Sequence, residues 1–255
     1  MPDHWHAFFA LTRREIQRFI NFKSMTIFPQ IVSTILYIVI FGFTLGGRIT
    51  SIHGFRYIEF ILPGLVLMAL MMSSYSNGAN FLFISRYDSS IQDVLLSPLS
   101  YFQMVLAYTL CSTIRGVLVG ILVLICGMIL LNLPLSSFLL SLYLLILTAQ
   151  IFSSFGIIIG LWAERWDHIM LFLSYIVTPL SFLGGTFYSL DMLPSTWKIV
   201  NFLNPFYYMI SSLRFGILGF EEFPMTYALL LLTCTGASLF IITVYLFKVG
   251  YKLKT

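Results

Sequence analysis

Long apolar runs separated by short polar segments dominate the hydrophobic pattern of this chain. A helix rises about 1.5 Å per residue, so roughly 20 apolar residues are needed to cross a hydrocarbon layer about 30 Å thick. Runs of about that length recur along the whole sequence, and we expect a single transmembrane domain spanning residues 1–255. The expected fold class is an all-α membrane protein. The runs predict six transmembrane helices, at about 25–45, 60–83, 104–131, 138–162, 169–187 and 227–247.

The residues before the first run follow an amphipathic pattern. Trp5, Phe8, Ile16 and other apolar residues recur at helical spacing, while Arg14 and further polar residues fall on other faces. This pattern predicts an amphipathic helix at about 4–22 that lies in the membrane interface.

Two segments between the runs depart from the simple alternation. Residues 85–100 mix polar and apolar positions and include Pro98, which predicts a short surface helix between the second and third spans. The segment between the fifth and sixth spans contains several prolines but is too apolar for an ordinary exposed loop. Irregular backbone at membrane depth must be buried in protein or line a wet cavity. We therefore expect re-entrant or membrane-packed helices in this segment.

Composition and charge support lipid as the surrounding solvent. The chain is 59% hydrophobic and only 9% charged, whereas soluble domains are about 25% charged. The net charge of +4 comes from basic residues beside membrane runs, so it indicates topology and no nucleic-acid partner is expected. One side of the six-span arrangement carries nine lysines and arginines and the other carries four. The positive-inside rule then places both termini in the cytoplasm.

Several kinds of chemistry have no signal in this sequence. There is no GxxxxGK[ST] phosphate loop, no HExxH and no GxSxG. The three cysteines show neither paired spacing nor a CxxC motif, so we expect no metal or other cofactor on this chain. The acidic residues lie in loops or at run ends, which disfavours proton-coupled transport through a buried carboxylate.

Arg115 falls within the third apolar run. A charge at the bilayer centre costs at least about 2.5 kcal/mol on insertion scales, so its guanidinium should face protein or water, or reach the interface. The run is longer than one crossing requires, so Arg115 could simply extend to the cytoplasmic surface. The functional alternatives are an anchor for an acidic substrate group and a tie between helices.

Two stretches resemble one known family. Residues 178–219, TPLSFLGGTFYSLDMLPSTWKIVNFLNPFYYMISSLRFGILG, look like the signature of type 2 ATP-binding-cassette transporter permeases, in particular bacterial inner-membrane exporters. The segment SSIQDVLLSPLS, residues 89–100, is similar to the first coupling helix of that family. The matching signature positions are Pro179, Gly184, Gly185, Pro194, Asn204, Pro205 and Arg214.

The resemblance implies a six-helix permease that pairs with a second copy of itself and with cytoplasmic ATPase subunits, which hold ATP and Mg²⁺. Besides these proteins, membrane lipid is the expected contact. Coupling to the ATPase is expected through Ile91, Asp93, Val94, Leu95, Leu96 and Pro98. Since the second and fifth spans line the path in related permeases, the candidate path residues are Ser73, Ser74, Asn77, Asn80, Thr178 and Ser181, together with Arg115.

Other functions fit parts of this pattern. A membrane anchor or scaffold for a cytoplasmic complex would need the coupling surface but no substrate path. An ion-coupled carrier would need a buried carboxylate that the sequence does not offer. The segment at 89–100 could also be only an amphipathic surface helix ended by a proline.

Overall fold

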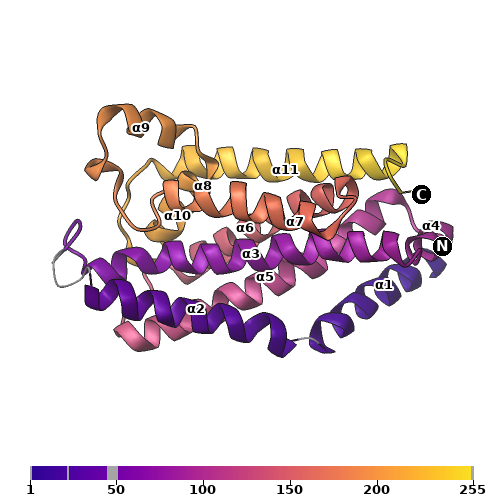
Figure 1. The fold of residues 1–255 in the computed structure, drawn as a ribbon, viewed down its shortest axis with the longest axis horizontal. Helices are drawn as coiled ribbons and strands as arrows, with labels where there is room; N and C mark the ends of the chain where they lie inside the picture. The colour runs from indigo at the N-terminus through magenta and orange to yellow at the C-terminus, as the bar shows by residue number, and fades with distance from the viewer. Residues whose placement is uncertain (1, 22, 45–50, 254–255) are drawn as a thin grey trace.

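The computed structural model describes residues 2–21, 23–44 and 51–253, and within these ranges it is helical apart from turns and one isolated bridge between Ile52 and Phe55. The long helices run side by side in an elongated bundle, with both ends of the chain at the same end of it (Figure 1). The elements are α1 Pro2–Asn21, α2 Lys23–Thr44, α3 Tyr57–Tyr87, α4 Ile91–Leu96, α5 Tyr101–Leu131, α6 Phe138–Trp162, α7 Trp166–Phe172, η1 Leu173–Val177, α8 Thr178–Leu183, η2 Leu190–Met192, α9 Ser195–Phe202, α10 Pro205–Leu218 and α11 Met225–Val249.

Five helical stretches of the described chain are long and apolar enough to cross a membrane. They are α3, α5, α6, α11 and the continuous stretch Trp166–Leu183 formed by α7, η1 and α8. The first predicted span falls on α2, whose apolar part among the described side chains is the shorter Phe28–Phe41. Leu45, at the end of that predicted span, lies outside the described residues.

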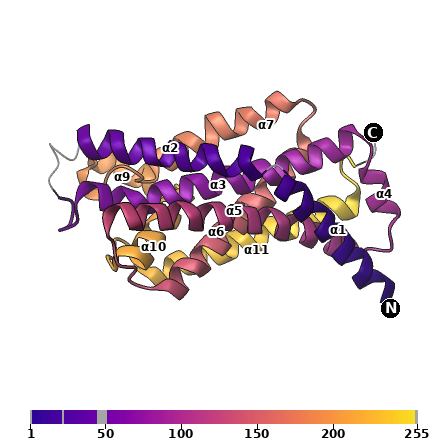
Figure 2. The same cartoon turned by 90° about the horizontal axis from the view of Figure 1, so that it is seen from below.

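The bundle is arranged around α3. Figure 2 shows α2 and α7 along one edge of the molecule and α6, α10 and α11 along the other, with α3 and α5 between them. Every residue of α3 from Phe60 to Met71 is buried, so this part of the helix is covered on all of its faces. The outer helices α5 and α11 instead expose apolar side chains such as Ile129 and Ile241, as expected for surfaces that face lipid.

Small residues let α6 lie directly against α3. A Cβ atom at Gly156 would lie 2.4 Å from the Tyr75 carbonyl oxygen, and one at Gly160 would lie 2.5 Å from the Ala79 carbonyl oxygen. Both distances are shorter than van der Waals contact, so these glycines permit an approach that no larger residue would allow. The Gly-x3-Gly spacing on α6 therefore serves packing within the chain.

The helix boundaries follow local sequence signals. Ser100 caps α5 by accepting a hydrogen bond from the Gln103 backbone N–H at 3.2 Å, and the Gln103 side chain accepts from the Ser100 backbone N–H at 3.0 Å. This is a capping box. Because it begins α5 at Tyr101, the predicted surface helix is reduced to the six residues of α4.

The fifth apolar stretch is not a regular helix. Its middle turn, η1, is a π-helix, and Pro179 follows at the start of α8. Proline has no N–H to donate to the preceding turn. Just before it, the backbone N–H and the hydroxyl of Thr178 both donate to the Leu173 carbonyl oxygen, the hydroxyl at 2.9 Å. The stretch ends at Leu183, four residues before the predicted end at 187, because Gly184 and Gly185 turn the chain away from the helix.

Candidate coupling surface and substrate path

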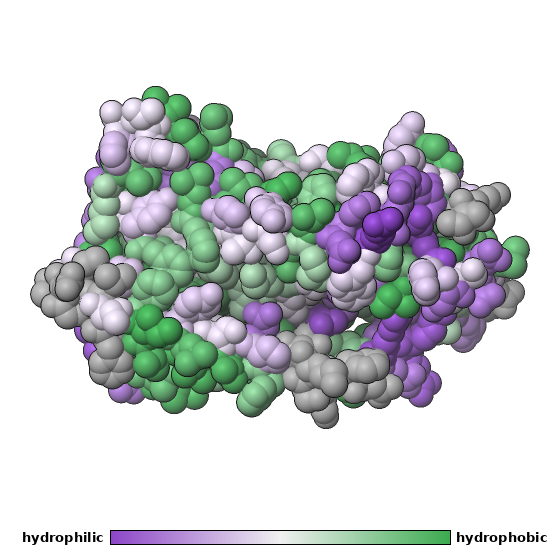
Figure 3. Space-filling view, in the orientation of Figure 1, coloured by the Kyte–Doolittle hydropathy of each residue, from purple (hydrophilic) through white to green (hydrophobic). Residues whose placement is uncertain are grey.

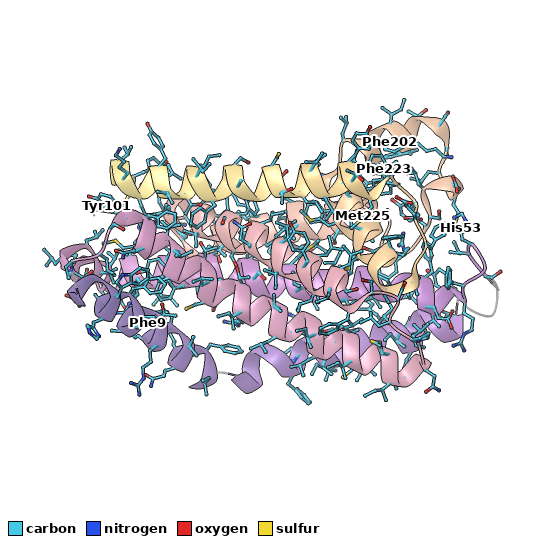
Figure 4. All side chains as sticks on the ribbon, turned by 180° about the vertical axis from the view of Figure 1, so that it is seen from behind. Phe9, His53, Tyr101, Phe202, Phe223 and Met225 are labelled. Atoms are coloured by element: carbon cyan, nitrogen blue, oxygen red, sulfur yellow. The ribbon has the colours of Figure 1, made fainter. Side chains whose placement is uncertain are left out.

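The two ends of the bundle differ in character. Phe9 on α1 and Tyr101 at the start of α5 mark one end, which we call the α4 end, and His53, Phe202, Phe223 and Met225 mark the other, which we call the α9 end (Figure 4). Hydrophilic residues gather on the visible face near α1 and α4, and hydrophobic residues extend over much of the remaining surface (Figure 3).

The α4 helix is fixed to the bundle by two of its predicted coupling residues. Ile91 and Val94 are 2% and 5% exposed and pack in a cluster with Phe8 and Leu11 of α1 and Met104 of α5. These two side chains are therefore turned toward their own chain, and the expectation that a partner contacts them directly is corrected. Their burial follows from the seating of α1 over α4, which the sequence pattern of α4 alone did not show.

The outward face of α4 consists of the remaining predicted residues. Leu96 is 86% exposed, Asp93 and Pro98 are also exposed, and Leu95 is half-buried. Asp93 and Arg14 line a shared hollow of about 260 Å³ between α1 and α4. The surface available to a partner at this end is thus Asp93, Leu95, Leu96 and Pro98.

Two basic residues hold the end of α6 beside this surface. Arg86 Nη1 donates to the carbonyl oxygens of Gly160, Leu161 and Ala163 at 2.7–3.2 Å. Lys252 Nζ donates to the Trp162 carbonyl oxygen at 3.1 Å and to Glu164 Oε1 at 2.8 Å. The last carbonyls of a helix lack partners within it and carry partial negative charge.

These contacts tie α3 and the C-terminal segment to one helix end, and the Lys252 ammonium lowers the pKa of the exposed Glu164 carboxyl. In the sequence, Arg86 and Lys252 contribute only to the excess of basic residues that predicts the topology. Their positions one turn from an apolar run were the signal that could have identified them as helix caps.

Arg214, one of the signature residues, is buried at the α9 end and contacts several groups there. Its side chain is 1% exposed and donates to Glu222 Oε2 at 2.5 Å and to the Gly185 carbonyl oxygen at 2.8 Å. Its guanidinium carbon lies 3.7 Å from the centre of the Phe60 ring. Glu222 also accepts from the Ser189 hydroxyl at 3.2 Å, and Ser189 is 3.0 Å from His53 Nε2. Glu222 and His53 were not among the predicted site residues.

The other signature residues shape the turn between α8 and α10. Asn204 caps α10 by accepting from the Phe206 N–H at 3.1 Å, and its amide donates to the Leu180 carbonyl oxygen at 2.8 Å. Pro205 occupies the first turn of α10, and Pro194 is the cap residue before α9. Gly184 lies against α10, where a Cβ atom would come within 2.9 Å of the Phe206 side chain. The signature therefore anchors α10 beneath α8.

A pocket of about 270 Å³ lies where α1, α3, α5 and α7 meet. Arg115 Nη1 donates to Asn77 Oδ1 at 2.5 Å, and Asn77 in turn donates to the Ser112 hydroxyl at 3.1 Å. The Arg115 guanidinium also lies 5.5 Å from the centre of the Phe19 ring on α1. Arg115 therefore ties α5 to α3, which was one of the roles that its position in the sequence left open. The lining residues are Glu15, Arg18, Phe19, Asn77, Asn80, Phe81, Ile84, Arg115 and Trp166.

A second pocket, of about 180 Å³, lies between α2, α3 and α8. Thr178 contributes to it, with Gln30, Thr34 and Tyr37 from α2 and Met72 from α3. Four of the predicted path residues therefore line pockets: Asn77, Asn80, Arg115 and Thr178.

The other three predicted path residues lie elsewhere. Ser73, Ser74 and Ser181 are at most 4% exposed and line neither pocket. Ser74 packs against Gly116, and Ser181 donates to the Thr178 carbonyl oxygen at 2.7 Å. The prediction that these three serines line the path is therefore corrected for this conformation, because neighbouring helices cover them. Among the described residues, no three His, Cys, Asp or Glu side chains group in a way that could hold a metal ion.

A multi-pass helical bundle with pockets between its spans is an architecture that membrane transport proteins have. The family profile described as ABC-2 type transporter matches residues 6–218, and the chain belongs to this family. It is a membrane permease subunit of an ATP-binding-cassette transporter, and membership implies association with an ATP-binding-cassette partner.

Named relatives agree with this assignment. The chain is 36% identical to the inner membrane transport permease YadH of Escherichia coli (strain K12) over 225 residues, which are 88% of each chain. It is 22% identical to nodulation protein J of Bradyrhizobium diazoefficiens over 216 residues, covering 84% of this chain and 82% of that protein. The corresponding protein of Rhizobium meliloti is also 22% identical, over 86% of this chain and 84% of the relative.

Proposed function

We propose that this permease is an exporter of the bacterial inner membrane, with six spans, both termini in the cytoplasm and an ATPase subunit bound at the α4 end. The observation that carries the proposal is the position of α4. It is held on the bundle by Ile91 and Val94 and presents Leu96 outward, at the end where both ends of the chain lie (Figure 1). ATP and Mg²⁺ would bind to the partner, since this sequence has no phosphate loop.

Six spans are supported by the arrangement of α2. This 22-residue helix runs alongside α3 and α5, and an even number of crossings returns the chain to its starting side. The excess of basic residues on that side favours the cytoplasm.

The proposed substrate path follows one face of α3. Ala69 lines the second pocket and Asn80 lines the first. They are three helical turns apart, about 16 Å along the axis, and therefore on the same face of α3. Two pockets along one helix face favour transport over a scaffold role, which would need no path.

A second copy of this chain would complete the path from the side of α7 and α8. That stretch exposes Leu171, Tyr175 and Phe182, and a homodimer could cover this face. Polar Thr178 and Gln30 lie close to it at the second pocket.

The coupling surface is tested by copurification. We expect the double variant D93A/L96A to lose most copurification with its ATP-binding-cassette partner subunit, because an exposed apolar anchor and its neighbouring charge are removed together. Truncating anchors of this kind typically weakens binding by roughly tenfold or more. L203A is the matched control, because Leu203 is 82% exposed at the opposite end. Undiminished copurification and ATPase activity in D93A/L96A would contradict the proposal.

A further inference from the structure

Four aromatic rings from two segments far apart in the sequence meet near the α9 end. Tyr37 and Phe41 come from α2, Phe182 comes from α8, and Phe187 lies in the turn after α8. The ring centres of Phe41 and Phe187 lie 4.5 Å apart in a stacked arrangement. The Phe187 ring centre is also 5.4 Å from that of Phe182 and 6.3 Å from that of Tyr37. Phe187 therefore joins α2 to α8, and we call these four side chains the aromatic cluster.

The aromatic cluster lies directly beyond the second pocket, on the side of the α9 end. Tyr37 lines that pocket, and Phe41 is one helical turn further along α2. Thr178 lines the pocket from α8, and Phe182 is one turn further along that helix. Both helices run toward the end that carries α9 (Figure 1). A molecule that leaves the second pocket toward the α9 end therefore meets the aromatic cluster first.

The chemical character of the lining changes between the pocket and the cluster. The pocket offers hydroxyl and amide groups, which belong to Gln30, Ser33, Thr34 and Thr178. The cluster offers aromatic carbon, and among its four rings only that of Tyr37 carries a hydroxyl. Apolar constrictions in membrane proteins stop permeation by excluding water. A packed aromatic cluster in this position is therefore suited to closing the path beyond a polar pocket.

The two rings on the side of α8 belong to one short unit. The Thr186 hydroxyl donates to the Ser181 carbonyl oxygen at 2.7 Å, which fastens the turn that carries Phe187 to α8. The π-turn η1 directly precedes α8, and helices commonly bend at such turns. Phe182 and Phe187 can therefore move together when α8 bends at η1.

We propose that the aromatic cluster is the outer gate of the substrate path, closed in this structure by the stacking of Phe187 on Phe41. The closed position is also held from α3, because the Tyr57 hydroxyl donates to the Phe187 carbonyl oxygen at 3.1 Å. Opening the gate requires α8 to move away from α2, which parts the stacked rings. This inference rests on the proposed transport function and adds the residues that control the exit from the path.

The gate is tested by the reaction of a cysteine inside the second pocket. In a background in which the three native cysteines are replaced by serine, M72C places a single thiol in the pocket lining. The permease and its ATP-binding-cassette partner are labelled in right-side-out spheroplasts depleted of ATP, with a small membrane-impermeant methanethiosulfonate. We expect slow labelling in the parent and labelling roughly tenfold or more faster in F41A and F187A, because each truncation removes one half of the stacked pair.

F223A is the matched control, because Phe223 lies at the same end but has its ring contacts with Tyr207 and Tyr208. It should label as slowly as the parent. F187L keeps an apolar side chain of similar bulk, so its labelling rate should fall between those of the parent and F187A. The double variant F41A/F187A should label no faster than the faster single variant, since both substitutions open the same gate. General loosening of the bundle would instead make the two effects accumulate.

Unchanged labelling in both F41A and F187A, or equal acceleration in F223A, would overturn the inference. T196C on α9 is exposed and reports the topology separately, because it should react in every variant. If T196C reacted only in inside-out vesicles, the proposed topology would be wrong. The M72C comparison would then be made in those vesicles, where the reagent still arrives from the α9 end, so the gate and the topology fail separately.

Discussion

Arg86, Arg115 and Arg214 lie inside helices of the bundle, and each guanidinium has different acceptors. Arg86 donates to the terminal carbonyls of α6, Arg115 to Asn77, and Arg214 to Glu222 and Gly185. A charged side chain in such a position is stable only when it is paired or reaches water. These contacts explain how this bundle tolerates the three guanidinium groups.

We expect R214Q to destabilise the protein strongly. The substitution leaves Glu222 buried without its ionic partner, and breaking a buried pair costs about 3–5 kcal/mol. The midpoint of thermal unfolding in detergent should fall by several degrees. R56Q is the control at the same end: Arg56 pairs with Glu59 but is exposed, and exposed pairs contribute about 0–1 kcal/mol.

The double variant R214Q/E222Q should recover part of that loss, since no uncompensated charge remains. Equal midpoints for R214Q and R56Q would show that the Arg214 pair does not anchor the α9 end.

At the scale of elements, α4 and the fifth stretch show how context changes a sequence pattern. The apolar positions of α4 suggested one ridge for a partner, but α1 covers Ile91 and Val94 and leaves Leu96 outside. The fifth stretch was expected as one plain span, yet a π-turn and Pro179 divide it. Such irregular turns often occur at functional sites, and this one adjoins Thr178 at the second pocket.

The contact between α3 and α6 gives a prediction at this scale. G160L should separate the two helices, because even a Cβ atom at Gly160 would lie 2.5 Å from the Ala79 carbonyl oxygen. Overpacking of this kind costs about 1–3 kcal/mol, so we expect a lower unfolding midpoint and weaker protection of α3 in hydrogen exchange.

A237L is the control, since Ala237 is exposed on α11 and its enlargement meets no neighbouring helix. If G160L unfolded at the same midpoint as A237L, close packing of α6 on α3 would not limit stability.

At the scale of the whole molecule, the two ends of the bundle should face opposite sides of the membrane. In a background without Cys111, Cys126 and Cys234, we expect T196C on α9 to react with a membrane-impermeant maleimide in intact cells. Q92C on α4 should react only after the membrane is opened, because the α4 end is proposed to be cytoplasmic. Both positions are exposed.

The reverse pattern of labelling would invert the proposed topology and place α4 out of reach of a cytoplasmic ATPase. Labelling of both positions in intact cells would instead contradict an arrangement in which the bundle crosses the membrane lengthwise.

The sequence by itself determined the fold class, the approximate limits of most long helices, the family and the residues of the signature. The fold class and the helix limits depend on local composition and spacing, which can be read without contacts because a lipid solvent requires long apolar runs. The family and the signature residues follow from the resemblance to known permeases. The resemblance also indicated Arg214 as important but gave no physical role for it.

Only the tertiary structure decided which side chains face one another. It paired Arg214 with Glu222, turned Ile91 and Val94 inward, buried Ser73, Ser74 and Ser181, and brought Arg18 of α1 to the pocket that contains Arg115. In a membrane helix, apolar residues face lipid and protein alike, so periodicity does not distinguish the two surfaces. The contacts between helices distant in sequence therefore had to be seen in the folded molecule.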